Sequence, residues 1–252
     1  MLWLCSGGIE AKLRRRNFVR HDTVVLNEDT NRMRNTIIII CAALGLSSCF
    51  GPCTDRVSGR FPAGEAELIC EADSTMRVLT IEDSLDLAVL RASSQDLTWK
   101  MLLSDEFKRL SELMIATVTH PSQDGVGIAG PQVGLNRRVV AVQRFDKDGE
   151  PFEVYPNVRI VWASDSLAAG PEGCLSVPNR RGDVLRSKEI VIEYADLHAM
   201  EELAATMSPG ELRRHFRSTP LPVIRDTITG FTAVIFQHET DHLDGVLYID
   251  RL

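Results

Sequence analysis

Two histidines near the end of the chain form the residue pattern with the most specific chemistry. His238 and His242 lie four positions apart in the stretch FQHETDHLDG, residues 236–245. On a helix this spacing places both imidazoles on one face, where they can bind one metal ion. Glu239 is adjacent, and a carboxylate there can accept a proton from a water molecule beside the metal. The stretch predicts a hydrolytic metal site, and its alternative is two surface histidines on an ordinary helix.

Two histidines leave a catalytic metal site short of a third protein ligand. The segment PEGCLSVP, residues 171–178, offers Cys174 between a glycine and a short apolar pair, just before an expected strand. A lone cysteine is often an inert buried residue, but this context makes Cys174 the best ligand candidate among the six cysteines. The six show no CxxC pair, so neither a zinc ribbon nor a dense disulfide framework is indicated.

A glycine-rich segment, DGVGIAGPQVG at residues 124–134, is the third candidate. It lacks the Lys-Ser/Thr of a phosphate loop and the strand-helix order of a dinucleotide fingerprint. Glycines allow a backbone to approach a bound peptide closely, and Gln132 supplies an amide donor of the kind that stabilises an oxyanion. A plain tight turn is the alternative interpretation of this segment.

The elements that must position these residues are mixed. Apolar residues at Phe231, Val234 and Ile235, followed by His238, form the stripe of a helix. A second helix should begin at the N-cap Ser104 and end near residues 120–121, and a short one is expected at 208–217. Strands are expected at residues 76–83, 137–145, 152–163 and 187–196. This order predicts an α+β fold, with mostly antiparallel strands packed around a C-terminal metal-binding helix.

The composition is that of a globular chain and argues against one class of partner. The chain has 252 residues, of which 44% are hydrophobic, and this is enough for a real core. Its formal net charge is −7, whereas nucleic-acid binding needs a concentrated Lys/Arg face. We therefore expect no nucleic-acid partner, and the sequence does not indicate an oligomeric state.

The N-terminal region has the anatomy of an export signal. From Met33 a basic start is followed by an apolar run at residues 37–46 and then by small residues before Cys49. The ending LSSC resembles the lipobox of bacterial lipoproteins, in which the cysteine is lipidated. If Met33 is the true start, the chain is expected at the bacterial cell envelope, attached to the membrane only through lipidated Cys49. The alternatives are a buried core strand at this place, an organellar presequence and a cytoplasmic protein.

The chain therefore divides into four expected parts. Residues 1–32 would be a non-native or discarded extension, 33–48 a signal peptide and 49–75 a tether in which Cys53 and Cys70 either pair or remain free thiols. Residues 76–252 would form the catalytic domain.

Taken together and in this order, the motifs GVGIAGPQ, EGCLS and QHETDH resemble the three signature motifs of peptide deformylases. These are metal hydrolases that remove the N-formyl group from N-formylmethionyl peptides and release formate. The likeness covers about residues 76–252. It implies one divalent metal ion, Fe²⁺ first and Zn²⁺ or Ni²⁺ as alternatives, whereas Cys/His₂ ligation alone would suggest zinc.

The resemblance also implies roles for individual residues. It implies metal ligation by Cys174, His238 and His242, and it makes Glu239 the general base and then the general acid. Gln132 and the backbone N–H of Leu175 would hold the oxyanion. The Gly127 backbone and Arg181 would contact the N-formylmethionyl peptide, and Arg186 and Asp241 match a family pair that fixes the helix. An apolar slot for the methionine side chain would be lined by Val126, Phe231, Val234 and Ile235, which could equally be core residues.

Two departures from the family and two rival functions complete the expectations. Gly130 stands where the family commonly has alanine, and residues 197–222 are longer than the usual connection, as a lid, a partner surface or a tolerated insertion would be. A metallopeptidase of the His-Glu-x-x-His type should have its third ligand downstream, but no His or Glu follows His242. A formyl-peptide binder that retains the metal without catalysis is the other rival.

Overall fold

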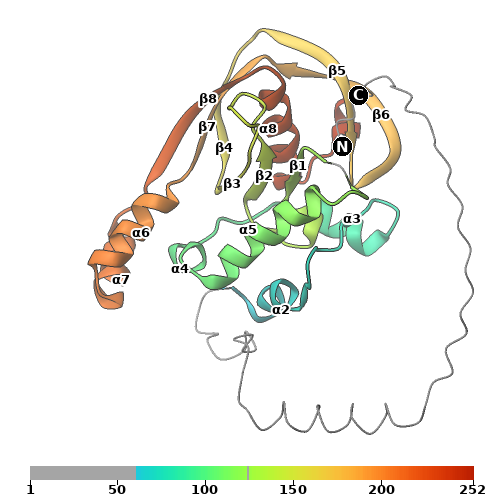
Figure 1. The fold of residues 1–252 in the computed structure, drawn as a ribbon. Coiled ribbons are helices and arrows are strands. Elements are labelled where there is room, and N and C mark those ends of the chain that lie inside the picture. The colour runs from blue at the N-terminus through green and yellow to red at the C-terminus, as the bar shows by residue number, and fades with distance from the viewer. Residues whose placement is uncertain (1–60, 124) are drawn as a thin grey trace, which may run out of the picture. The chain divides into compact units, whose positions relative to one another are not determined.

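The computed structural model describes residues 61–123 and 125–252. Its strands form three antiparallel sheets (Figure 1). The sheet orders are β1-β2-β3, β4-β7-β8 and the hairpin β5-β6. The strands are β1 Gly127–Ala129, β2 Val139–Gln143, β3 Phe152–Pro156, β4 Arg159–Ala163, β5 Leu167–Cys174, β6 Val177–Ser187, β7 Glu189–Ala195 and β8 Val223–Thr229. The predicted signal peptide, Cys49 and Cys53 lie outside the described residues.

Helix α8, Gly230–Leu243, contacts strands of all three sheets. Its core side carries Ala233, Ile235 and Phe236, which pack with the apolar residues of β2, β7 and β8. Phe231 belongs to the predicted stripe, but its side chain is 37% exposed and contacts Phe145 instead. The expected α+β fold, with antiparallel strands around a C-terminal helix, is confirmed.

A second apolar core lies on the other side of β1 and β2, beneath helix α5, Asp105–Val118. This helix begins as predicted, because the Ser104 hydroxyl accepts the Phe107 N–H at 3.2 Å. Its buried face includes Leu110 and Met114, as the helical spacing predicted. Helix α5 thereby supports the sheet that carries the glycine-rich segment.

Helix α2, Ala63–Glu71, lies within the range expected to be a tether. Ala66 and Ile69 are buried in the core beneath α5, and Glu65 pairs with Arg137 at 2.9 Å. The described part of that range is therefore packed on the catalytic domain, because every third or fourth side chain of α2 is apolar. Cys70 at the end of α2 is disulfide-bonded.

Two strand predictions are wrong in detail. Residues 76–83 form no strand, although Leu79 N–H donates to the Gln132 carbonyl at 2.8 Å and Ile81 N–H donates to the Ser176 carbonyl at 2.9 Å. The strand expected at 152–163 is split into β3 and β4. Asn157 adopts a left-handed backbone (φ 55°), which turns the chain from one sheet into another.

The predicted insertion at 197–222 contains α6, Leu197–Thr206, and α7, Pro209–Ser218. Helix α7 begins as predicted, with the Ser208 hydroxyl accepting the Glu211 N–H. Phe216 stacks on Trp99 with 5.5 Å between ring centroids. Figure 1 shows both helices at the lower left, well away from the end of α8 that carries the histidines. The position of α6 and α7 therefore argues against the interpretation of this segment as a lid over the histidines.

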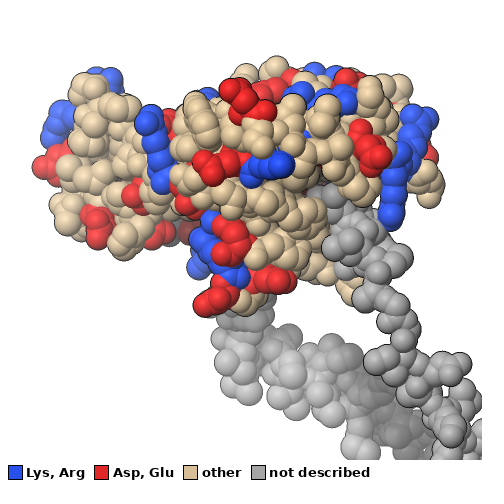
Figure 2. Space-filling view, turned by 90° about the horizontal axis from the view of Figure 1, so that it is seen from above, with Lys and Arg blue, Asp and Glu red and all other residues tan. Residues whose placement is uncertain are grey.

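The remaining elements are short and connect these layers. They are α3 Ser84–Leu90, α4 Trp99–Leu102 and the 3-10 helices η2 Gly130–Val133 and η3 Tyr248–Arg251. On the face shown in Figure 2, basic and acidic side chains are interspersed and no continuous basic surface is visible. Among the described helices, none has the length and apolar character needed to cross a membrane.

Candidate metal centre

Three buried side chains from two elements converge on one point. Cys174 ends strand β5, and His238 and His242 lie one turn apart on α8. One potential ligand atom from each lies within 4.8 Å of the other two. Cys174 Sγ is 3.2 Å from His242 Nε2. A soft thiolate and two imidazoles at this spacing fit one divalent metal ion such as zinc or ferrous iron.

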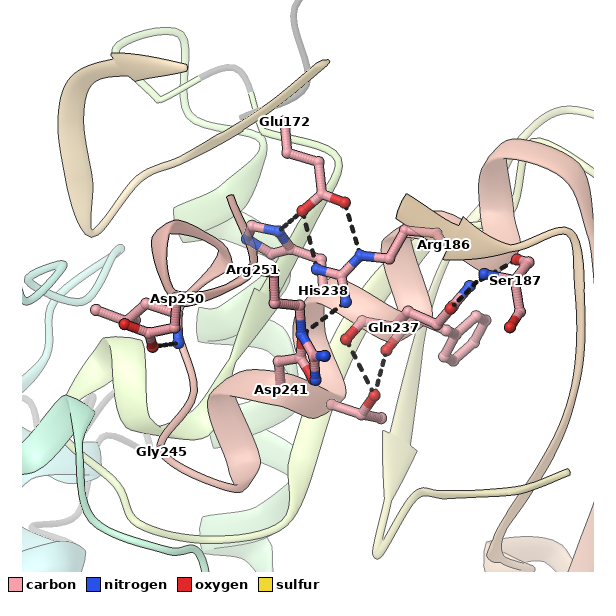
Figure 3. A network of polar contacts seen from close by, with 12 residues as sticks. Glu172, Arg186, Ser187, Gln237, His238, Asp241, Gly245, Asp250 and Arg251 are labelled. Carbon is pink, nitrogen blue, oxygen red and sulfur yellow. Dashed lines mark hydrogen bonds and ion pairs between the residues drawn. The ribbon is translucent and has the colours of Figure 1, made fainter. Parts of the chain in front are cut away.

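Glu172 fixes the orientation of the first histidine. Its Oε2 atom lies 2.8 Å from His238 Nδ1, so Nδ1–H donates to the carboxylate and Nε2 is left for a metal. Arg186 holds Glu172 through Nε at 2.7 Å and Nη2 at 3.0 Å (Figure 3). The expected pair of Arg186 and Asp241 is confirmed at 2.6 Å. Sequence reasoning gave Glu172 no role, although it opens the motif EGCLS.

The ionisation of the buried groups suits metal ligation. Burial of Cys174 opposes the thiolate, but the neighbouring His242 and His238 outweigh it and hold the pKa of the thiol well below its ordinary value. Burial of Glu172 likewise opposes its charge, while Arg186 and His238 outweigh it and lower its pKa to about 2. Glu172 is therefore a carboxylate at neutral pH and a constant acceptor for His238.

Glu239 faces the three ligands with a free oxygen. The side chain is buried, and its Oε2 atom has no hydrogen-bond partner among the described residues. Burial raises the pKa of Glu239, and the nearby His238 and His242 offset this only in part. A buried carboxyl with an unused oxygen and a raised pKa is suited to accept and return a proton.

Gln132 is held in a fixed orientation beside Cys174. Its Oε1 atom accepts the Ala129 N–H at 2.9 Å, so the amide nitrogen is directed the other way. That nitrogen lies 3.5 Å from Cys174 Sγ and donates to the Ser176 hydroxyl at 3.2 Å. The 3-10 helix η2 thus places an amide donor beside Cys174.

A cavity of about 730 Å³ opens next to Cys174. Leu175 and Arg181, two of the predicted site residues, line it, together with Ser122, Gln123, Gly173, Val177, Pro178, Asn179 and Arg180. Of the predicted apolar slot, Ile235 lies against Gly127 and Glu239. Val126 and Val234 are partly buried, and neither they nor Phe231 line this cavity.

Tyr248 is a contact of the site that the sequence did not indicate. Its buried ring stacks on His238 with 6.0 Å between centroids and 25° between planes. No spacing rule connects a residue in η3 with a histidine on α8, so only the folded chain reveals it.

Known proteins resemble this chain in sequence and in fold. The family model of polypeptide deformylase matches residues 76–208 and 222–252, which leaves out α7. Peptide deformylase 2 of Gloeobacter violaceus is 37% identical over 168 residues, covering 65% of this chain and 74% of the relative. The peptide deformylase of Leptospira biflexa is 33% identical over 172 residues, covering 65% of this chain and 82% of the relative.

Solved structures agree with the sequence relatives. A class I type b peptide deformylase from Acinetobacter baumannii with bound actinonin is 28% identical and has a TM-score of 0.55, covering 71% of this chain and 99% of that one. The same enzyme with bound Met-Ala-Ser gives a TM-score of 0.55 at 28% identity, covering 71% of this chain and 98% of that one. By family model, relatives and fold, the chain belongs to the polypeptide deformylase family, hydrolases that remove the formyl group from peptides.

Proposed function

We propose that this chain binds one divalent metal ion through Cys174, His238 and His242 and deformylates N-formylmethionyl peptides. The observation that carries the proposal is the convergence of these ligands within 4.8 Å, beside the unpartnered oxygen of Glu239. A metal held there supplies Lewis acidity, which lowers the pKa of a water molecule and polarises a carbonyl oxygen. Fe²⁺ is the first candidate by the family resemblance, with Zn²⁺ and Ni²⁺ as alternatives.

Glu239 carries the proton transfers of the proposed reaction. Its carboxylate accepts a proton from the attacking water as the new C–O bond forms at the formyl carbon. The same carboxyl then gives that proton to the nitrogen as the C–N bond breaks, so that formate and a free amine leave. Its burial excludes bulk water, and the unused Oε2 atom is available for both steps.

The developing negative charge on the formyl oxygen needs fixed donors. The Gln132 amide nitrogen is held in its orientation because the Oε1 atom of the same side chain accepts the Ala129 N–H. We assign it, together with the backbone N–H of Leu175, as the oxyanion donor, because preorganised donors act without reorganisation cost.

The free edge of β1 is the proposed binding place for the peptide backbone. Strand β1 is the end strand of its sheet, and Val126 and Ile128 pair with β2 on its other side. Antiparallel alternation leaves the N–H and C=O of Gly127 directed away from β2. An extended peptide can add there as a further strand. Arg181, which lines the cavity next to Cys174, is proposed to contact it.

The decisive experiment measures formate release from formyl-Met-Ala-Ser by the iron-loaded chain. Parent protein should release formate, and Glu239→Ala should not, because the proton acceptor is lost. A tripeptide suits this assay because Met-Ala-Ser is bound in a solved relative. Release that does not depend on Glu239 would refute the assigned chemistry. Internal peptide cleavage would instead favour the metallopeptidase, and metal binding without either activity the non-catalytic binder.

We further propose that the chain acts at the bacterial cell envelope after lipidation of Cys49, on free formyl-peptides or exported proteins. The motif LSSC and the basic, apolar run before it support this proposal. Globomycin-sensitive processing and palmitate labelling that Cys49→Ser abolishes are the expected results. Full-length, unlabelled cytoplasmic protein would refute export.

A further inference from the structure

We propose that Arg251 is a positioning residue for the metal centre, although it lies in η3 and outside all three motifs. It would act on His238 through three intervening charged side chains, Asp241, Arg186 and Glu172. The inference rests on the proposed metal site and extends it to the last 3-10 helix of the described chain.

Arg251 forms a bidentate contact with the carboxylate of Asp241 through two nitrogens of its guanidinium. Nε donates to Oδ2 and Nη2 donates to Oδ1, each at 2.5 Å. The same Oδ2 atom accepts Arg186 Nη1 at 2.6 Å from the other side. Figure 3 shows Asp241 between the two arginines, with Glu172 and the ring of His238 beyond Arg186. A fork of two charge-assisted hydrogen bonds fixes the carboxylate in angle as well as in position.

The charges of this chain of contacts balance only when Arg251 is counted. Glu172 and Asp241 are two anions, and Arg186 and Arg251 are two cations. Arg186 serves both carboxylates, with Nε and Nη2 on Glu172 and Nη1 on Asp241. Without Arg251, Arg186 would be the one arginine left to serve both carboxylates, with His238 donating to Glu172 alone.

Arg251 is 44% exposed, but the side chains that it supports are buried, which limits how far water can take its place. The side chain of Glu172 is 1% exposed, that of Arg186 is 5% exposed and that of Asp241 is 13% exposed. A buried carboxylate that loses a partner is costly and draws on the nearest remaining donor. Arg186 would then be pulled toward Asp241 and would hold Glu172 less firmly, and Glu172 orients the imidazole of His238.

A second ion pair on the same helix provides a matched control. Asp250 in η3 pairs with Arg91, and both of these side chains are 38% exposed. This pair attaches η3 to the end of α3, and among the described residues the hydrogen bonds of the Asp241 carboxylate go to Arg186 and Arg251 and not to this pair. An exposed pair of this kind contributes little to stability. Its loss therefore tests whether attachment of η3, rather than the contact of Arg251 with Asp241, affects metal binding.

The test is the affinity for Co²⁺, measured by chelator competition, together with the visible absorption spectrum of the cobalt-loaded protein. Arg251→Met should weaken Co²⁺ binding about 10-fold and shift the absorption bands, because partners behind a ligand typically contribute 10–100-fold. Arg91→Met should leave the affinity and the spectrum as in the parent. Spectral bands report the ligand geometry and do not move with a loss of overall stability.

Each outcome decides between the two proposals. Parent protein that does not bind Co²⁺ refutes the proposed metal site itself. Parent that binds, with Arg251→Met binding equally well and with the same spectrum, refutes the positioning role alone. If Arg251→Met does not fold, Arg251→Lys keeps the charge but loses the two-point contact. It should bind Co²⁺ with intermediate affinity, and parent-like affinity and spectrum would overturn the inference.

Discussion

The carboxylate of Glu239 on α8 lies directly against the backbone of Gly127 on β1. A methyl group on Gly127 would come within 2.5 Å of Glu239 Oε1 and within 2.8 Å of Ile235 Cγ2. A side chain at this place would therefore displace the proposed proton acceptor. The close approach explains why a glycine is needed at the start of the buried strand β1, since a strand position otherwise disfavours glycine.

Gly127→Ala should therefore lower activity more than stability. The Glu239 side chain can rotate away at small cost, but its carboxylate then leaves the reacting position. A misplacement of about 1 Å can cost on the order of 100-fold in rate. We expect a fall in kcat of roughly that size for formate release, together with a smaller fall in the denaturant midpoint because the buried Ile235 must also shift. A variant with parent kcat would show that the position of Glu239 at Gly127 is not required.

Gly130→Ala should lower stability more than activity, although alanine is common at this place in the family. The new methyl group would lie 2.6 Å from the Arg137 carbonyl oxygen and 2.8 Å from the Leu135 carbonyl oxygen. Backbone atoms cannot move aside as a side-chain end does, so the variant should lose about 1–3 kcal/mol of unfolding free energy.

Gly210→Ala in α7 is the matched control for that measurement, because a methyl group there meets no atom within 4 Å. The same substitution in a helix should be neutral or stabilising by up to about 1 kcal/mol. Urea unfolding of the two variants beside the parent measures both effects. Equal stability of Gly130→Ala and parent would mean that the loop of η2 relaxes around the new methyl group.

Stability should fall in acid because an ion pair that is not part of the metal centre, between Arg77 and Asp86, loses its negative charge. Arg77 hydrogen-bonds both oxygens of Asp86, at 2.6 and 2.8 Å, and lowers the pKa of this carboxyl. The folded-state pKa of Asp86 lies below its unfolded value, so the carboxylate stabilises the fold above the unfolded pKa of about 3.9. That contribution is lost as the pH falls from there through the lowered folded value.

The Asp86→Asn variant tests this assignment. It should be less stable than the parent at neutral pH and should show a shallower loss of stability below about pH 4. Chemical unfolding at several pH values measures the slope. An unchanged slope would mean that Asp86 ionises alike in the folded and unfolded chain.

The sequence predicted those parts of the site that depend on local periodicity. The spacing of His238 and His242 set both rings on one face, and Ser104 marked the start of α5. Glu172, the partner of His238, escaped prediction because its contacts depend on long-range pairing, whereas the pair of Arg186 and Asp241 was expected from the family resemblance. Glu172 and Arg186 belong to strands of a hairpin whose register no local pattern fixes.

The division of the expected strand at residues 152–163 into β3 and β4 was not predicted, for a related reason. Residues 152–163 are apolar enough for one strand, but the side chain of Asn157 hydrogen-bonds the backbone of Leu97 at 2.7 and 2.9 Å. Those contacts, 60 positions apart in sequence, stabilise a left-handed turn that strand propensity alone opposes. Tertiary contacts therefore decided where β3 ends and β4 begins.

Removal of the metal should lower thermal stability, because the proposed ligands come from two elements that the ion would join. Cys174 ends β5 and the histidines lie on α8, with Cys174 and His242 68 positions apart. Any ion that binds only the folded state adds about 2.7 kcal/mol when its free concentration is 100-fold above Kd. A chelator should therefore lower Tm by several degrees, and added Zn²⁺ should restore it. Cys174→Ala should melt at the same temperature with and without chelator, since one of three ligands is gone. A parent Tm that does not respond to chelator or Zn²⁺ would contradict a metal shared by these elements.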